Sequence, residues 1–493
     1  MKKKLLFLVA AFTLFVPSVL AAELTASTDA ELINAFATAA SGDTIKLTAN
    51  IENHKGGSSS LMVNGGRNIT LDLNGHNITV EPSLVEGTKN PVNKSIVIED
   101  GTLTIKGKGT IKHETHVAVN VWASSTETSD PFSTLTVEKD VTLEGNTGIS
   151  VFYGTTTKSY GGVVNFSGKI NATENGITIN GYIKDTTNAP VINIKNGANI
   201  TSVGNDGVGL YGAGNGTWNI ENGVTVVGEG SALGIKAGTF NIKGGTFTAT
   251  GEYVGSPELY GNGINPSGST IQIETNSASY YGHVNINIED GTFTSKKGAT
   301  LLEYGSRTDT AVEAIEITGG EFNSAGEVGN LVVSNGLKTN QENRNAISIS
   351  GGVFSNEISE DFLSEDSITI SFAAIIDKEV QDLTNEVGVI VVPAGTKLDD
   401  EAIAELKALI GEVEEGYKLE GFYTDSEAKT KLDLSKEFTE NTTIYINMVK
   451  ETVKEEKNPA TNDMNLALIL ASLGLASAGA VLVSRKKLAK ANR

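Results

Sequence analysis

The chain has 493 residues, no cysteine and a formal net charge of −21. This length exceeds one ordinary small domain, although a single elongated repeat domain could hold most of it. Apolar residues make up 39% of the chain, which excludes a disordered protein, and the negative charge excludes a basic nucleic-acid-binding surface. Without disulfides, an exported chain of this kind must be stabilised by a large core or by hydrogen bonds between strands.

The amino-terminal segment has the three parts of a secretory signal. Three lysines precede an apolar stretch from Leu5 to about Val16, and small residues stand at Ala21 and Ala22. A basic start, an apolar centre and small residues at a cleavage site are typical of exported proteins. The sequence therefore predicts a signal peptide over residues 1–21, with an uncleaved anchor as the alternative.

The segment that follows, residues 28–40, has the pattern of a short amphipathic helix. Thr28 and Glu31 have the spacing of a capping box, and Leu32 and Phe36 share one apolar face. A stack of strands exposes unpaired backbone groups and apolar side chains at its end, and a helix there would cover them. We therefore expect this helix to cap the fold described next.

Between about residues 60 and 360 the chain repeats one short pattern. Each copy has two apolar positions separated by a polar residue, then a turn, then another apolar position, as in "LTIKGKGTIK". Alternation with period two predicts strands, and Gly, Asn or Asp in the turns permits positive φ. The second apolar positions are Leu73, Ile105, Val137, Phe166, Ile194, Ile220, Ile242, Ile288, Ile317 and Ile349. They are 22–32 residues apart, except for an interval of 46 residues that we interpret as two copies.

Stacking of these copies would bury one continuous interior that no copy could bury alone. A further short strand precedes several copies, as in "NTGISVF" and "SALGIKAG", so each turn of the stack holds several strands. The pattern resembles the right-handed parallel β-helix superfamily best known from pectate lyases, over roughly residues 25–360. The resemblance implies a mostly β fold with a parallel β-helix over residues 22–362. A leucine-rich or propeller array is the alternative.

A second small domain is predicted over residues 366–449. "SITISFAAII" and "GVIVVPAG" predict strands, and "DDEAIAELKALIGE" predicts a helix at about residues 399–410. The last part resembles the listerial-type B repeat, a β-grasp (α+β) module that serves as a surface spacer or contact domain. The matching residues are Gly416, Tyr417, Gly421, Phe422, Tyr423, Thr424, Asp425, Asn441, Thr443 and Tyr445, whereas the final tryptophan of that family is missing. A polar linker over residues 450–457 follows.

The carboxyl-terminal segment, residues 458–493, combines a short motif, an apolar run and a basic tail. Residues 466–483 carry no charge and are long enough for a membrane-spanning helix, and the basic residues after them would keep that end cytoplasmic. The motif consists of Asn458, Pro459, Ala460, Thr461 and Asn462. This order resembles the sorting signal of Gram-positive surface proteins, in which a sortase cuts after the threonine and joins it to peptidoglycan. The resemblance implies a cell-wall protein that contacts the membrane only through this apolar segment before sorting. A single-span membrane anchor is the alternative.

Glycine-rich connections between the predicted strands hold several aromatic residues. We identify seven candidate ligand-binding aromatics: Tyr153, Tyr160, Tyr211, Tyr253, Tyr260, Tyr280 and Tyr281. If these connections project on one side, the rings would form a row suited to sugar rings or to protein contact. Packing inside the stack is the alternative, and Trp218, at an alternating strand position, is expected in the core.

No motif identifies a catalytic residue, a metal ligand or a cofactor site. His113 and His116 of "HETH" would point to opposite faces of a strand, and we expect a surface strand or turn there. Glycoside hydrolases need converging carboxylates, and a lyase of this fold would need calcium ligands and a basic residue. We therefore expect an extracellular, non-catalytic adhesin that binds glycans or surface proteins and no nucleic acid. A wall-bound polysaccharide lyase or glycoside hydrolase acting in the groove of the coil is the alternative.

Overall fold

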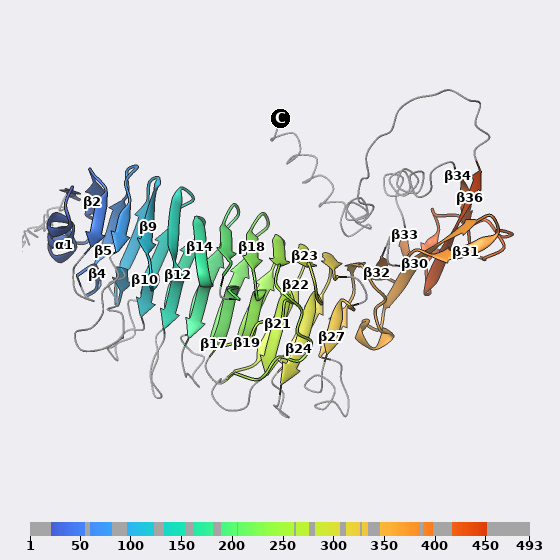
Figure 1. Cartoon of the computed structure of the whole chain (residues 1–493). Coiled ribbons are helices and arrows are strands. Elements are labelled where there is room, and N and C mark those ends of the chain that lie inside the picture. The colour runs from blue at the N-terminus through green and yellow to red at the C-terminus, as the bar shows by residue number, and fades with distance from the viewer. Residues whose placement is uncertain are drawn as a thin grey trace, which may run out of the picture.

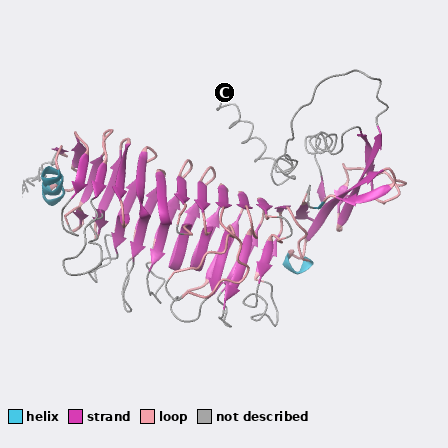
Figure 2. Ribbon diagram, in the orientation of Figure 1, coloured by secondary structure: helices cyan, strands magenta, loops and turns pink. Residues whose placement is uncertain are grey.

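The computed structural model describes residues 21–54, 60–80, 96–122, 133–152, 161–180, 189–204, 206–260, 263–275, 282–305, 312–325, 328–333, 346–384, 388–397 and 417–450. In these residues nearly all regular structure is strand (Figure 2). Most strands form one long stack that runs along the molecule in chain order, from the blue end to the yellow end of Figure 1. The protein is thus mostly β, with a large and largely parallel sheet.

The stack has three columns of strands, which we name A, B and C. The chain passes from A to B to C and then returns to A, and each strand pairs in parallel with the strand one turn earlier. Every turn therefore adds one strand to each column, an arrangement compatible with the predicted parallel β-helix.

Column A consists of β1 (Glu23–Ala26), β2 (Thr44–Leu47), β5 (Asn68–Asp72), β8 (Thr102–Lys106), β11 (Thr134–Val137), β13 (Val163–Phe166), β15 (Val191–Ile194), the second halves of β17 (Val208–Ile220) and β19 (Ser231–Ile242), β22 (Val284–Ile288), β25 (Val312–Ile317) and β28 (Ile347–Ile349). Column B consists of β3 (Ile51–His54), β6 (Ile78–Val80), β9 (Gly109–His113), the first halves of β12 (Val141–Phe152) and β14 (Lys169–Asn180), β16 (Asn199–Ser202), β18 (Thr225–Gly228), β20 (Thr246–Ala249), β23 (Thr292–Ser295), β26 (Glu321–Asn323) and β29 (Gly352–Phe354). Column C consists of β4 (Met62–Val63), β7 (Ile96–Ile98), β10 (Val117–Trp122), the second halves of β12 and β14, the first halves of β17 and β19, β21 (Ile271–Thr275), β24 (Leu301–Gly305) and β27 (Leu331–Val333).

The apolar side chains predicted to stack do so in column A. All nine predicted positions from Ile105 to Ile349 pair with the next position of the series in the adjacent turn, and all nine are buried. The first predicted position, Leu73, is wrong by two residues, because Leu71 is the residue that pairs with Ile105. Three alternating leucine and isoleucine residues precede the turn at Asn74, so the pattern alone leaves the register open.

The interval of 46 residues is one turn and not two. Ile242 of β19 pairs directly with Ile288 of β22, and Phe247 of β20 pairs with Phe293 of β23. The additional residues lie in the connection from β20 to β21, residues 250–270. Because a connection outside the ladder can lengthen at little cost in loop entropy, the columns continue on either side of it without interruption. We call its described residues, 250–260 and 263–270, the insertion.

Helix α1 (Asp29–Thr38) forms where the amphipathic pattern predicts a helix, between β1 and β2. The Thr28 hydroxyl accepts a hydrogen bond from the backbone N–H of Glu31 (3.3 Å), which satisfies one of the unpaired donors of the first turn. Leu32 and Phe36 are buried and belong to the same core as the columns. The helix lies at the blue end of the stack in Figure 1.

A smaller group of strands follows the stack. It contains the predicted β30 (Ser367–Ile376) and β32 (Val389–Pro393), together with β31 (Glu379–Asp382), β33 (Thr396–Lys397), β34 (Tyr417–Tyr423), β35 (Glu437–Phe438) and β36 (Thr442–Lys450), and a 3₁₀ turn, η1 (Glu360–Phe362), precedes it. β30 pairs in parallel with β36 and antiparallel with β31 and β32. The helix predicted at residues 399–410 lies outside the described residues. β32 also pairs antiparallel with β29, so the sheet of this module continues into the stack.

Candidate functional site

Three of the seven candidate tyrosines lie in the described residues: Tyr253 and Tyr260 belong to the insertion, and Tyr211 lies beside it. Tyr211 is buried on the outer side of β17, in a small apolar cluster against which Ile264 of the insertion packs. Tyr253 is half-buried and Tyr260 is 51% exposed. The other four, Tyr153, Tyr160, Tyr280 and Tyr281, lie outside the described residues. Trp218 is fully buried, as predicted, and its ring stacks on Phe240 of the next turn (5.2 Å between ring centroids).

A buried polar cluster lies on the outer side of column C beneath the insertion. Lys236 of β19 donates a hydrogen bond to Glu274 of β21 (Nζ to Oε1, 2.5 Å), and both side chains are fully buried. Tyr304 of β24 donates to the second carboxylate oxygen of Glu274 (2.7 Å). Gln272 donates to the Tyr304 hydroxyl (2.8 Å) and accepts from the Ser231 hydroxyl (2.7 Å). These five residues, which we call the Lys236 cluster, come from three successive turns of the coil.

The electrostatics of the Lys236 cluster follow from its burial. Removal from water disfavours a charged ammonium and so lowers the pKa of Lys236, although the Glu274 carboxylate opposes this shift. Burial also raises the pKa of Tyr304, and the negative charge of Glu274 raises it further. Tyr304 is therefore a neutral hydrogen-bond donor to a buried carboxylate.

The Lys236 cluster holds the backbone of the insertion. The Lys236 ammonium donates to the carbonyl oxygen of Tyr260 (2.5 Å), and the backbone N–H of Tyr260 donates to Glu274 Oε1 (3.2 Å). Gln272 donates to the carbonyl oxygen of Asn265 (2.5 Å). The Lys236 ammonium and the Glu274 carboxylate thus both bond to the backbone of Tyr260, whose own side chain is exposed.

The burial of Lys236 beneath the insertion bears on the alternative that the chain is a polysaccharide lyase or glycoside hydrolase. A lysine general base must reach a substrate proton within hydrogen-bond distance. The insertion covers Lys236, which is 2% exposed, so no polymer chain can reach its ammonium in this conformation. Across the described ranges, no three His, Asp or Glu side chains are close enough together to hold a metal ion.

His113 and His116 are expected in a surface strand or turn, and the structure differs from this expectation. His113, the last residue of β9, is 1% exposed, and its ring lies edge-on to that of His116 with centroids 5.6 Å apart. The surface prediction is wrong for His113 because the end of this strand faces inward, at a register position shared with Val80. The expectation that the two rings point to opposite faces of a strand is also wrong, because the strand ends at His113 and the bend at residues 114–116 brings the rings together.

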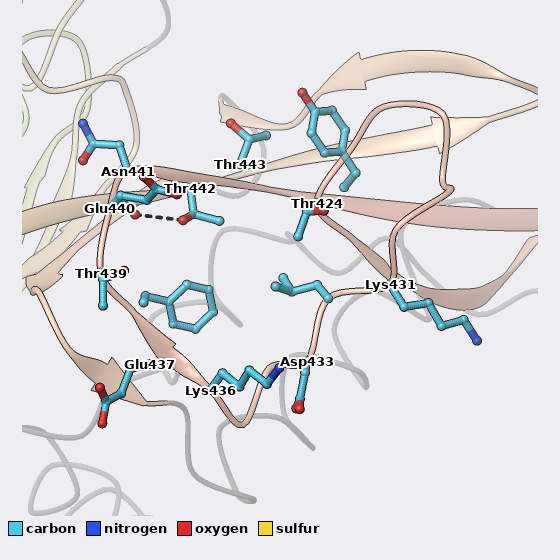
Figure 3. A pocket seen from close by; sticks show the side chains of 13 residues that line it. Thr424, Lys431, Asp433, Lys436, Glu437, Thr439, Glu440, Asn441, Thr442 and Thr443 are labelled. Carbon is cyan, nitrogen blue, oxygen red and sulfur yellow. Dashed lines mark hydrogen bonds between the residues drawn. The ribbon is translucent and has the colours of Figure 1, made fainter.

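The module contains a second candidate site, a cavity of about 560 Å³ (Figure 3). It is lined by five side chains that carry hydroxyl groups: Thr424, Thr439, Thr442, Thr443 and Tyr445. Its size suits a small ligand. However, Asn441 at its rim accepts from the backbone N–H of Thr369 and donates to Glu360 (both 2.9 Å), and Thr443 bonds to the Ser371 hydroxyl (3.0 Å). The contacts of Asn441 and Thr443 give these two residues a structural role, because they join the start of β36 to β30 and to η1.

The Lys236 cluster was not predicted from the sequence, and only a weak signal of it exists. Its charged and amide residues occupy alternate positions in otherwise apolar strands, in "GIKAG" and "IQIET". A polar residue at such a position reads equally well as an exposed surface residue.

The sorting motif, Asn458–Pro459–Ala460–Thr461–Asn462, and the apolar run after it lie outside the described residues. Within the part of the chain that the structure describes, no helix is long and apolar enough to span a membrane. Comparison of the chain with protein-family models, with curated proteins and with solved structures finds no match.

Proposed function

We propose that this chain is an extracellular rod, attached to the cell wall, that binds its target without cleaving it. The rod is a right-handed parallel β-helix, the hand that connections between parallel strands strongly favour. The observation that carries the proposal is the single apolar core that runs through every turn, from Ala26 to Val391. Because each turn packs on the next, such a rod needs no disulfide or cofactor to hold a binding surface away from the cell.

The module after the rod is a β-grasp-like spacer next to the wall. Its first and last long strands, β30 and β36, lie side by side and parallel, with antiparallel strands outside them. This order, together with the B-repeat resemblance of residues 416–445, supports that assignment. The linker and sorting motif that follow would place the module between the rod and the peptidoglycan.

Attachment to the wall can be tested by changing the threonine at the proposed cleavage site. We expect the wild-type chain, produced in a Gram-positive host that has a sortase, to fractionate with peptidoglycan after boiling in detergent. Thr461→Ala keeps the backbone carbonyl that the sortase thiolate attacks but removes the threonine side chain by which the motif would be recognised, so we expect this variant in the membrane fraction. Ala460→Ser, at the variable position of the motif, is the matched control and should remain with the wall. Equal fractionation of all three chains would contradict wall sorting.

Binding without cleavage has a separate test. In a screen against pectin, other glycans and matrix proteins, we expect the chain from residue 22 to residue 457 to retain at least one of them without releasing new reducing ends, with or without calcium. The covered position of Lys236 supports this expectation. Release of polysaccharide fragments in the presence of calcium would favour the lyase alternative instead.

A further inference from the structure

The insertion gathers exposed apolar side chains that the rest of the described surface keeps apart. Within the described residues, the exposed large hydrophobic side chains are Val203 (46%), Val254 (43%), Leu259 (40%), Tyr260 (51%) and Val380 (49%). Three of these five lie within residues 254–260. Single exposed apolar residues are normal on a protein surface, whereas a local group of them marks a site of interaction.

The same segment is held more firmly than an ordinary surface connection. Both backbone polar groups of Tyr260 are bonded to fully buried charges, the N–H to Glu274 and the carbonyl to Lys236. The Asn265 side chain donates to the carbonyl of Glu258 (2.7 Å), and the N–H of Val254 donates to the carbonyl of Ser267 (2.9 Å). A buried ion pair contributes little net stability, so its clearest effect here is to fix the position of Tyr260.

A fixed tyrosine with an exposed ring suits a particular kind of partner. The ring has a flat apolar face and a polar edge, which match the face and the hydroxyl groups of a pyranose ring, and its fixed backbone lowers the entropy lost on binding. Three partly exposed side chains are few for the core of a standard protein interface, which buries about 800 Å² on each partner.

The charge of the surroundings narrows the choice of polysaccharide. Glu258, next to Leu259, is exposed, and the whole chain carries a net charge of −21. Anionic polymers such as homogalacturonan would therefore be repelled from this surface. An uncharged polysaccharide meets no such barrier.

We propose that the insertion is the binding element of the rod, that it binds an uncharged polysaccharide by stacking of a sugar ring on Tyr260, and that Lys236 and Glu274 act as positioning residues for Tyr260. This inference rests on the proposed binding function and adds to it a site and a ligand class. Wall attachment of many copies would strengthen a weak single contact through avidity.

The test is affinity gel electrophoresis of the full-length chain through gels that contain β-glucan, xylan, galactomannan or starch, with homogalacturonan as the anionic comparison. We expect at least one neutral polymer to retard the wild-type chain and Tyr260→Ala to weaken that binding about tenfold. Tyr260→Phe keeps the apolar face of the ring and loses only the polar edge, so it should bind more tightly than Tyr260→Ala. Val203→Ala and Val380→Ala remove equally exposed apolar side chains elsewhere and are the matched controls.

The positioning role has its own measurement. Lys236→Met should weaken retardation while Tyr260 is present, and the double variant Lys236→Met/Tyr260→Ala should bind no more weakly than Tyr260→Ala alone, because Lys236 acts through Tyr260. Circular dichroism checks that each variant keeps the strand signal of the wild type. If the losses of binding caused by the two single substitutions add up in the double variant, Lys236 does not act through Tyr260, and the positioning role is contradicted.

The outcomes separate this inference from the proposed function. Wild-type retardation that is unchanged in Tyr260→Ala overturns the inference and leaves a binding rod. Retardation by homogalacturonan alone also overturns the inference. Binding to an immobilised matrix protein, with no binding to any neutral polysaccharide, overturns it as well. Both of these results leave the proposed binding function standing. A wild-type chain that binds neither polysaccharide nor matrix protein would overturn both.

Discussion

At the scale of single residues, Tyr304 gives the clearest pH dependence. Burial, followed by the charge of Glu274, raises its pKa above the ordinary value of 10.0. The unfolded chain therefore loses the Tyr304 proton at a lower pH than the folded chain does. The stabilisation that depends on this proton is complete below about pH 10 and is lost progressively as the pH rises toward the folded pKa.

We expect Tyr304→Phe to flatten this dependence. At about pH 8 the variant should be less stable than wild type, because the buried Glu274 carboxylate loses a hydrogen-bond donor. At about pH 11 the difference in stability between the two chains should shrink, because the wild-type chain loses the stabilisation that depends on the Tyr304 proton and the variant has no such proton. Urea denaturation midpoints of both chains at both pH values measure this. A difference of the same size at both values would contradict the role assigned to Tyr304.

At the scale of elements, column A carries a ladder of asparagine side chains on its outer face. Asn165, Asn193, Asn219, Asn241 and Asn287 occupy one register position in five successive turns. Each side-chain amide after the first donates to the side-chain oxygen of the turn before it (2.9–3.0 Å). Asn219 takes part in two of these bonds, whereas Asn165 and Asn287, at the two ends, take part in one each.

This ladder predicts graded losses of stability. A net hydrogen bond of this type contributes about 1 kcal/mol, so Asn219→Ala should lower the free energy of unfolding about twice as much as Asn165→Ala or Asn287→Ala. Urea denaturation with an unchanged m-value is the measurement. The three sites are half-buried, and the end variants serve as controls for the loss of one amide. Equal losses at all three would mean that water replaces the ladder bonds.

The same column shows which elements the sequence could predict. Two apolar positions separated by a polar residue and followed by a turn predict the strands of column A, and the structure confirms the positions from Ile105 onward. The pattern does not fix the register where two neighbouring apolar positions fit it equally well. Leu71 and Leu73 both satisfy it, and only pairing with the next turn decides between them.

The Lys236 cluster could not be predicted for a different reason. Lys236 and Glu274 are 38 residues apart, and Glu274 and Tyr304 are 30 residues apart. Their contact depends on the register across the turn of 46 residues, which we interpreted as two copies. With that interpretation, Glu274 would not have lain next to Lys236. The candidate site therefore required the three-dimensional structure, whereas the parallel strands of column A could be predicted from the sequence.

At the scale of the whole molecule, one strand joins the two parts of the chain. β32 pairs with β29 of the stack on one side and with β30 of the module on the other. Its side chains alternate between the two interiors, as those of a strand do. Val391 is buried in the core of the rod, and Val392 is buried in the core of the module. The sequence predicts this strand and a change in composition near residue 362, but not the pairing of β32 with β29.

Neighbouring positions of β32 should therefore act on different parts of the molecule. Val391→Ala and Val392→Ala each remove two buried methyl groups, at about 2 kcal/mol. In amide hydrogen exchange followed by mass spectrometry, we expect Val391→Ala to speed exchange in β28 and β29, and Val392→Ala to speed it in β30 and β36. Each variant is the control for the other, because they share the strand, the residue type and the substitution. If the module were an independent domain tethered to the rod, both substitutions would speed exchange in β30 and β36 alone. Exchange in β28 and β29 therefore measures whether packing at Val391 stabilises the last turns of the stack.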